Sequence, residues 1–299
     1  MAKELKGVLV ALATPFAPDG SVDQQQLRAV VDHTIDGGVH GVVACGSTGE
    51  FSALTADERR VVVETVIDQT AGRVPVVAQT GSTSTAEAIE LSRHAEAAGA
   101  DVVMPVAPFY EALSLAETTT YLRTVADAVQ VPVMLYNLPA ATGVNLEPDV
   151  VAGLARDVQN IRYIKNTTPD MAQSAQLIHL YGDLVDTFVG WDSLGLCSLV
   201  SGAAGIMAGT ANIIPAQLAA VYDAVRSGDL AAARQAWDPI FPLLDACLSV
   251  NFIAAVKVGM DAVGVPAGDP RAPFAALSGE DEARIRALAS VHAAAEQVS

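Results

Sequence analysis

The feature that most constrains the fold of this chain is a series of short apolar runs in its first two-thirds. The runs are rich in valine, isoleucine and leucine, and they occupy residues 7–14, 41–45, 75–79, 101–105, 132–136, 161–165, 187–190 and 204–208. Continuous apolar runs of this length are typical of strands that are buried on both faces, as in a parallel sheet. The sequence therefore predicts eight buried, parallel strands.

Helices are predicted between most of these runs, because several spacers open with a capping-box pattern. The patterns are Ser21 with Gln24, Thr55 with Glu58, Ser84 with Glu87, and Ser114 with Glu117. Glycines at 37, 38, 72 and 99 stand where such helices are expected to end. Regular alternation of strand and helix predicts an α/β protein with a (β/α)8 TIM barrel. An open, doubly wound sheet is the alternative, but no GxGxxG pattern follows the first run.

The pattern changes after about residue 215. Residues 216–227, 230–245, 248–263 and 279–297 are predicted to be helical, with no strand between them. We therefore predict a barrel domain over residues 1–228 and a C-terminal helical extension over residues 229–299.

Composition excludes several classes of partner. The chain of 299 residues is 51% hydrophobic and 17% charged, which is typical of a globular protein. Its formal charge of −17 argues against nucleic acid and anionic membrane surfaces as partners. The long uncharged stretch 193–222 could span a bilayer, but its glycines, Asn212 and Pro215 favour a buried strand flanked by helices.

The cysteines and histidines give no sign of a disulfide framework or a metal site. Cys45, Cys197 and Cys247 are widely spaced, and the five histidines lack metal-ligand spacing. Residues 1–7 do not resemble a secretory signal. These features predict a cytoplasmic protein that needs no metal and no organic cofactor.

In barrels of this kind the active site lies at the C-terminal ends of the strands. Lys165 ends the sixth run, and strand alternation places it on one face with Ile161 and Tyr163. Apolar surroundings disfavour the charged ammonium form, and a neutral amine can condense with a ketone to a Schiff base. The alternative is a lysine that reaches from the strand end to solvent.

Other strand ends carry hydroxyl groups. Ser47 and Thr48, between Gly46 and Gly49, could bind a carboxylate with backbone N–H groups, or could simply cap the next helix. Tyr136 could relay protons or be a core tyrosine. Tyr110 could complete a hydroxyl relay or pack in an interface.

Taken together, these motifs resemble the dihydrodipicolinate synthase / N-acetylneuraminate lyase family of class I pyruvate aldolases. The matching segments occur in that family's order and approximate spacing: 46–50 (GSTGE), 136–139 (YNLP), 163–165 (YIK), 202–205 (GAAG) and 212–215 (NIIP). The resemblance extends to Lys257 and the RAP segment at 271–273, so it covers essentially the whole chain.

The resemblance implies a role for each matching position. Lys165 falls on the lysine that forms the Schiff base with pyruvate or another 2-keto acid, and Tyr136 falls on the proton-relay tyrosine. Ser47 and Thr48 fall on the pair that binds the pyruvate carboxylate. Tyr110 falls on a tyrosine that reaches into a neighbouring subunit's site in dihydrodipicolinate synthases. Family members are commonly tetramers built as dimers of dimers.

Departures from the family patterns bear on the substrate. Dihydrodipicolinate synthases carry a carboxylate-binding arginine where this chain has Ala141, and histidines that bind inhibitory lysine where it has Ala56 and Arg59. Like neuraminate lyases, the chain has a threonine at Thr167. Of their Asp-Glu pair after strand seven it keeps only the aspartate, in Gly190-Trp191-Asp192-Ser193. We expect Thr167, Gly190 and Asp192 to contact the substrate.

Three hypotheses follow. The first is a Schiff-base lyase that uses pyruvate and an aldehyde to form or cleave a 2-keto acid of the 2-keto-3-deoxy sugar acid type. The second is a 4-hydroxy-tetrahydrodipicolinate synthase, which would condense pyruvate with aspartate semialdehyde. The third is a non-catalytic barrel that binds a keto acid, against which the intact Lys165–Tyr136 pair speaks.

Overall fold

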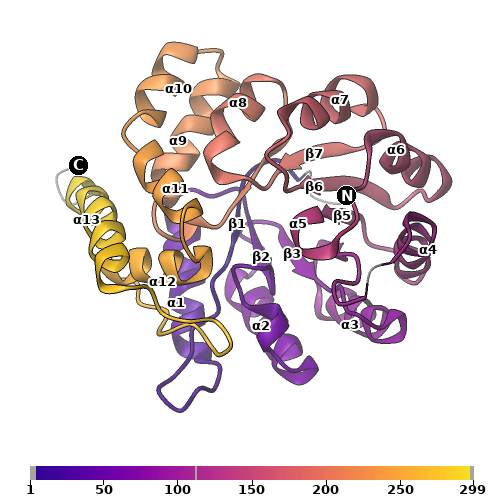
Figure 1. The fold of residues 1–299 in the computed structure, drawn as a ribbon, viewed down its shortest axis with the longest axis horizontal. Helices are drawn as coiled ribbons and strands as arrows, with labels where there is room; N and C mark the ends of the chain where they lie inside the picture. The colour runs from indigo at the N-terminus through magenta and orange to yellow at the C-terminus, as the bar shows by residue number, and fades with distance from the viewer. Residues whose placement is uncertain (1–4, 112, 297–299) are drawn as a thin grey trace.

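The computed structural model describes residues 5–111 and 113–296, and its centre is a closed barrel of eight parallel strands (Figure 1). Each strand pairs with the next along the chain, and β8 pairs with β1 to close the ring. The strands are β1 Gly7–Ala11, β2 Gly41–Ala44, β3 Val76–Gln79, β4 Val102–Met104, β5 Val133–Asn137, β6 Ile161–Asn166, β7 Asp186–Val189 and β8 Gly205–Ala208. The predicted (β/α)8 fold is confirmed, and every strand end but one lies within one residue of its prediction; the exception is β1, which ends three residues early.

Strand alternation divides the core into two layers. Inward-facing side chains fill the barrel with Leu9, Ala11, Val43, Val77, Met104, Met134, Tyr163, Phe188 and Met207. Their neighbours in sequence face outward and pack against the surrounding helices, as Val8, Val10, Val42, Ala78 and Leu135 do. Both faces of every strand are therefore covered, which explains why the runs read as continuously apolar.

Strand β6 departs from simple alternation at its start. The register against β5 shifts there, so that Val133 pairs with Ile161 but Met134 pairs with Tyr163. Arg162 is the extra residue, and it is exposed. The shift puts Ile161 in the outer layer while Tyr163 points into the barrel. The prediction that Ile161 shares a face with Lys165 is therefore wrong, whereas Tyr163 does share it.

Helices surround the barrel and connect its strands (Figure 1). They are α1 Gln24–Asp36, α2 Ala56–Thr70, α3 Thr85–Ala98, α4 Leu115–Ala126, α5 Pro139–Thr142, α6 Pro148–Asp157, α7 Met171–Tyr181, α8 Gly195–Val200 and α9 Pro215–Arg226. Single 3-10 turns lie at η1 Phe51–Ala53, η2 Asp192–Leu194 and η3 Thr210–Asn212. The uncharged stretch 193–222 thus holds α8, β8 and most of α9, as predicted.

The predicted helix starts are only partly right. Thr55 and Ser114 each form a full capping box with the glutamate three residues on. Ser84 caps α3, but the Glu87 carboxylate bonds Ser82 instead of returning to the cap. The prediction at Ser21 is wrong, because Asp23 accepts the cap hydrogen bond of α1.

Four further helices follow the barrel, α10 Leu230–Trp237, α11 Phe241–Leu248, α12 Phe252–Ala262 and α13 Gly279–Glu296. The single helix predicted over 230–245 is wrong: α10 and α11 are separate. Pro242, in the first turn of α11, has no N–H to continue a hydrogen-bond ladder from α10. The helix predicted from 248 begins at 252, where the Asn251 side chain caps it. The domain division at residue 228 stays a prediction.

None of the helices in the described part of the chain is both long enough and apolar enough to cross a membrane.

Candidate active site

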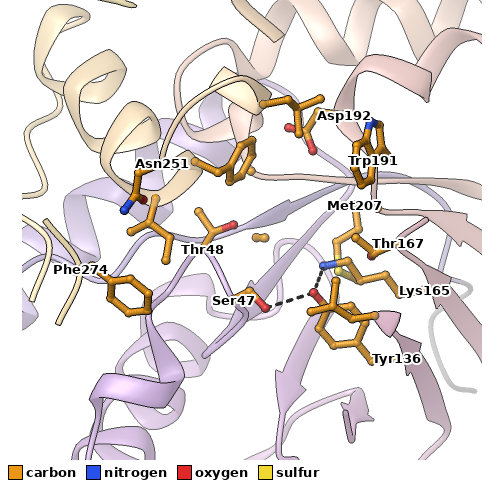
Figure 2. A pocket seen from close by; sticks show the side chains of 17 residues that line it. Ser47, Thr48, Tyr136, Lys165, Thr167, Trp191, Asp192, Met207, Asn251 and Phe274 are labelled. Carbon is orange, nitrogen blue, oxygen red and sulfur yellow. Dashed lines mark hydrogen bonds between the residues drawn. The ribbon is translucent and has the colours of Figure 1, made fainter. Parts of the chain in front are cut away.

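The C-terminal ends of the strands open into a pocket of about 330 Å³ (Figure 2). All the predicted site residues except Tyr110 line it: Ser47, Thr48, Tyr136, Lys165, Thr167, Gly190 and Asp192. Tyr136 and Lys165 lie near the ends of β5 and β6, and the others lie in the loops after β2, β6 and β7. The barrel geometry therefore brings together side chains that lie up to 145 residues apart in sequence (192 − 47).

Lys165 points into this pocket from β6 and is almost fully buried, at 4% exposure. Its Nζ lies 3.2 Å from the hydroxyl of Tyr136 and 4.2 Å from the centre of that tyrosine ring. The pairing follows from register, because Tyr136 and Lys165 are direct neighbours across β5 and β6. Within the described residues, Lys165 Nζ makes no ion pair within 4 Å. The closest polar contact of the amine is thus the phenol of Tyr136, while the Asp192 carboxylate interacts with it electrostatically from beyond ion-pair distance.

A second hydroxyl extends the contact. Ser47 Oγ lies 3.1 Å from Tyr136 Oη, so that the amine, the phenol and the serine form one chain (Figure 2). Groups at these distances can pass a proton from one to the next. The chain ends at the loop where a carboxylate is expected to bind.

The loop that carries Ser47 and Thr48 has an unusual backbone. Cys45 and Glu50, on either side of it, both have φ of +57°, a left-handed conformation that non-glycine residues seldom adopt. In the described structure, neither the Ser47 nor the Thr48 N–H donates to an intramolecular acceptor. Two hydroxyls and two backbone N–H groups are therefore available in one loop, which suits a carboxylate.

A buried ion pair holds the end of this loop. Lys257 Nζ, from α12, lies 2.6 Å from Glu50 Oε1, and the two side chains are 2% and 0% exposed. The backbone N–H of Arg271 donates to the other Glu50 oxygen at 2.8 Å. Burial lowers the pKa of Lys257, and the Glu50 carboxylate opposes that effect. The C-terminal extension therefore fixes a loop of the barrel.

Thr167 and Gly190 shape the floor beside Lys165. Thr167 lines the pocket, and its buried Oγ1 has no hydrogen-bond partner among the described residues. A Cβ at Gly190 would lie 2.5 Å from Lys165 Cε and would also collide with Thr167 Oγ1. Glycine is therefore required at 190 for both side chains to keep their positions.

Asp192 lines the pocket, but one of its carboxylate oxygens already accepts hydrogen bonds from Thr210. Oδ2 accepts hydrogen bonds from Thr210 N at 2.8 Å and from Thr210 Oγ1 at 2.6 Å. Burial raises the pKa of this carboxyl, and the bonds from Thr210 act against that rise. Through these hydrogen bonds Asp192 joins the loop after β7 to the loop after β8.

Tyr110 lies outside this pocket. It is 85% exposed and borders a separate surface hollow with Thr83, Pro108 and Thr120. Within one chain it cannot complete the hydroxyl relay. Its predicted action across a subunit interface stays a prediction.

Several residues that line the pocket were not singled out from the sequence: Leu138, Trp191, Leu248, Asn251, Phe252, Ile253 and Phe274. Five of these come from the C-terminal extension, after α11 begins. No sequence motif marks these five residues, because they reach the pocket only when α11, α12 and the segment near residue 274 fold over the barrel mouth. Across residues 5–111 and 113–296, no cluster of three or more His, Cys, Asp or Glu could hold a metal ion.

Comparison with known proteins identifies the family. The model of the dihydrodipicolinate synthetase family matches residues 4–292. The chain belongs to this family. The family consists of pyruvate-dependent class I aldolases, so the chain is a carbon–carbon lyase, and the resemblance inferred from its motifs is confirmed.

Relatives of known name agree with this assignment. A 4-hydroxy-tetrahydrodipicolinate synthase of Pelobacter propionicus is 41% identical over 283 residues, covering 95% of this chain and 97% of that protein. One from Geobacter sulfurreducens is 40% identical with the same coverage.

Solved structures of the family superpose closely. YagE of E. coli K12, a prophage protein of the dihydrodipicolinic acid synthase family solved with pyruvate, has a TM-score of 0.91 at 33% identity, over 95% of this chain and 97% of that one. A chloride-inhibited dihydrodipicolinate synthase of Acinetobacter baumannii, also with pyruvate, has a TM-score of 0.92 at 31% identity, over 97% and 99%.

Proposed function

We propose that Lys165 forms a Schiff base with pyruvate or another 2-keto acid, and that the enzyme uses it to make or cleave a carbon–carbon bond. The observation that carries this proposal is the contact chain from Lys165 Nζ to Tyr136 Oη at 3.2 Å and on to Ser47 Oγ at 3.1 Å. A buried lysine amine in contact with a phenol that can transfer its proton is placed for nucleophilic attack on a ketone.

Each neighbour of Lys165 has a proposed task. Ser47 and Thr48 bind the keto-acid carboxylate and so place its C2 carbon beside the amine, which supplies orientation. Tyr136 moves the protons that imine formation and hydrolysis require, with Ser47 as the next group in the relay. The protonated imine nitrogen then accepts the electron pair from C3 when the carbon–carbon bond breaks or C3 loses a proton. Thr167 and Asp192 face the second substrate.

The candidate reactions differ in their second substrate, the aldehyde that reacts with pyruvate. The sequence favours a 2-keto-3-deoxy sugar acid aldolase, because Ala141 replaces the carboxylate-binding arginine of the synthases. The names of the relatives favour 4-hydroxy-tetrahydrodipicolinate synthase. A coupled assay with aspartate semialdehyde separates them: turnover at a normal enzyme's rate would establish the synthase and show that Ala141 does not prevent the reaction.

Borohydride trapping tests the Schiff base itself. Incubation with pyruvate and sodium borohydride is expected to add the mass of the reduced adduct to the peptide that holds Lys165. Lys165→Arg is the matched variant, because it keeps the charge and cannot form a stable imine. If the intact wild-type protein gains no mass, or if Lys165→Arg gains the same mass, the proposal fails.

We further propose a homotetramer built as a dimer of dimers, with Tyr110 at a subunit interface. The 85% exposure of this large ring within one chain supports a covering partner. Light scattering after size-exclusion chromatography measures the mass, and a monomer would contradict the proposal. The cytoplasmic location stays a prediction.

A further inference from the structure

The pocket above Lys165 has two chemically different halves. Its floor is polar, with Ser47, Thr48, Tyr136, Thr167 and the lysine itself. Its outer wall is apolar and partly aromatic, and consists of Leu138, Trp191, Leu248, Phe252, Ile253 and Phe274. Figure 2 shows Trp191 at the upper right and Phe274 at the lower left, with Thr48 and Ser47 between them.

The volume leaves room for more than pyruvate. At about 330 Å³ the pocket is in the range that holds a drug-sized molecule, roughly 300–1,000 Å³. Pyruvate bound to Lys165, with its carboxylate at Ser47 and Thr48, stays on the floor. The carbonyl compound that reacts with it must therefore lie against the apolar wall.

Charge disfavours a second carboxylate in this outer half. Lys165 is the only lysine or arginine among the described residues that line the pocket, and the imine uses its nitrogen. Ala141 is exposed and does not line the pocket. A carboxylate on the aldehyde would lose its water shell without gaining a cation, which is unfavourable. The net charge of −17 repels it as well.

The wall also offers little to a chain of hydroxyl groups. Among the described residues that line the whole pocket, only Asn251 has an amide side chain and only Asp192 has a carboxylate, and Thr210 already occupies Asp192 Oδ2. Hydroxyls that face Phe252, Phe274 and Leu248 would be desolvated without gaining hydrogen bonds, which is unfavourable. An apolar substituent fits the same surface without that loss.

We propose that the second substrate is an aldehyde with an apolar substituent about the size of an aromatic ring. This inference depends on the proposed Schiff-base chemistry. The Lys165 amine and the pyruvate carbonyl take up one proton and lose water to form a protonated imine, and loss of a C3 proton then gives the enamine. Its C3 bonds to the aldehyde carbon while the aldehyde oxygen gains a proton. Water then releases a 4-hydroxy-2-keto acid and restores the amine, without any oxidation or reduction.

The test compares aldehydes on the full-length wild-type protein. Trapping with pyruvate and borohydride comes first, because its failure removes the proposed function and this inference with it. Initial rates with pyruvate are then measured by mass spectrometry of the product for benzaldehyde, D-glyceraldehyde, succinate semialdehyde and aspartate semialdehyde. Benzaldehyde is expected to have the highest kcat/KM, by about tenfold or more. A higher value for any of the other three, when trapping succeeds, overturns the inference alone.

Two variants of the apolar wall test whether it is responsible for the preference for benzaldehyde. Trp191→Ala and Phe252→Ala are each expected to lower kcat/KM for benzaldehyde by about ten- to a hundredfold, with a much smaller change for acetaldehyde. Both variants should still be trapped fully with pyruvate, which shows that they are folded. Phe241→Ala is the matched control, because this aromatic side chain on α11 is 40% exposed and does not line the pocket. Equal losses for both aldehydes would contradict a wall that selects apolar substituents.

Discussion

The buried ion pair between Lys257 and Glu50 gives a prediction whose magnitude can be worked from the structure. The two side chains are 2% and 0% exposed, so removal of one leaves the other charge desolvated and unpaired. Breaking such a pair costs about 3–5 kcal/mol. At about 2 °C per kcal/mol, near the low end for large domains, Lys257→Met should lower Tm by roughly 6–10 °C.

Glu50→Gln should have a comparable effect for a different reason. The Gln oxygen can still accept from the Arg271 N–H, but its NH2 group would then face the Lys257 ammonium, with two donors opposed. The double variant has no uncompensated charge, so its loss should be smaller than the sum of the single losses.

Thermal melts followed by circular dichroism measure these differences in Tm. The protein concentration is kept fixed, because association between subunits shifts the apparent Tm. Arg60→Met is the control: it removes a surface pair with Asp57, which is 91% exposed, and such pairs contribute about 0–1 kcal/mol. Single losses no larger than that of Arg60→Met, or losses that add fully in the double variant, would refute the reasoning.

Three more predictions follow from the site and its surroundings. Gly190→Ala should cut borohydride trapping with pyruvate severely, because the new Cβ meets Lys165 Cε; unchanged trapping would contradict this. Iodoacetamide at pH 8 should modify the exposed Cys197 in the native protein. Cys45 and Cys247 should stay unmodified, because burial raises the pKa of their thiols to about 11 and about 12 respectively. Peptide mass spectrometry measures the modification of each cysteine. Hydrogen bonding to Arg271 holds the pKa of Glu58 below its usual value, so its stabilisation is present above about pH 4.3 and is lost as pH falls through the folded pKa. The Tm gap between wild type and Glu58→Gln should therefore narrow in acid, and a gap that widens would contradict the linkage.

The barrel and the polar floor of its pocket could be predicted because local sequence patterns encode them. Buried parallel strands read as apolar runs, and each site residue on the floor ends such a run or follows it within three residues, as Lys165 and Ser47 do. Parallel closure then brings those ends together without further information. Errors arose where tertiary packing overrides local pattern, as at Arg162, where one extra residue in β6 reverses which side chains face the barrel.

The outer half of the pocket could not be predicted in this way. Leu248, Asn251, Phe252 and Ile253 carry no motif, and their ordinary interpretation is helix packing or a loop. They become pocket residues only because α11 and α12 cross the barrel mouth. The same holds for Lys257, whose partner Glu50 lies 207 residues earlier (257 − 50).

The amino-acid order alone determined the strand-and-helix repeat, the lysine at a strand end and the type of chemistry it can perform, because these depend on neighbours a few residues apart. Tertiary structure alone decided that Tyr136 and Ser47 reach that lysine, that Tyr110 does not within one chain, and that aromatic side chains surround the entrance. Those outcomes depend on contacts between distant segments, and closure of the ring and packing of the last helices are what bring such segments together.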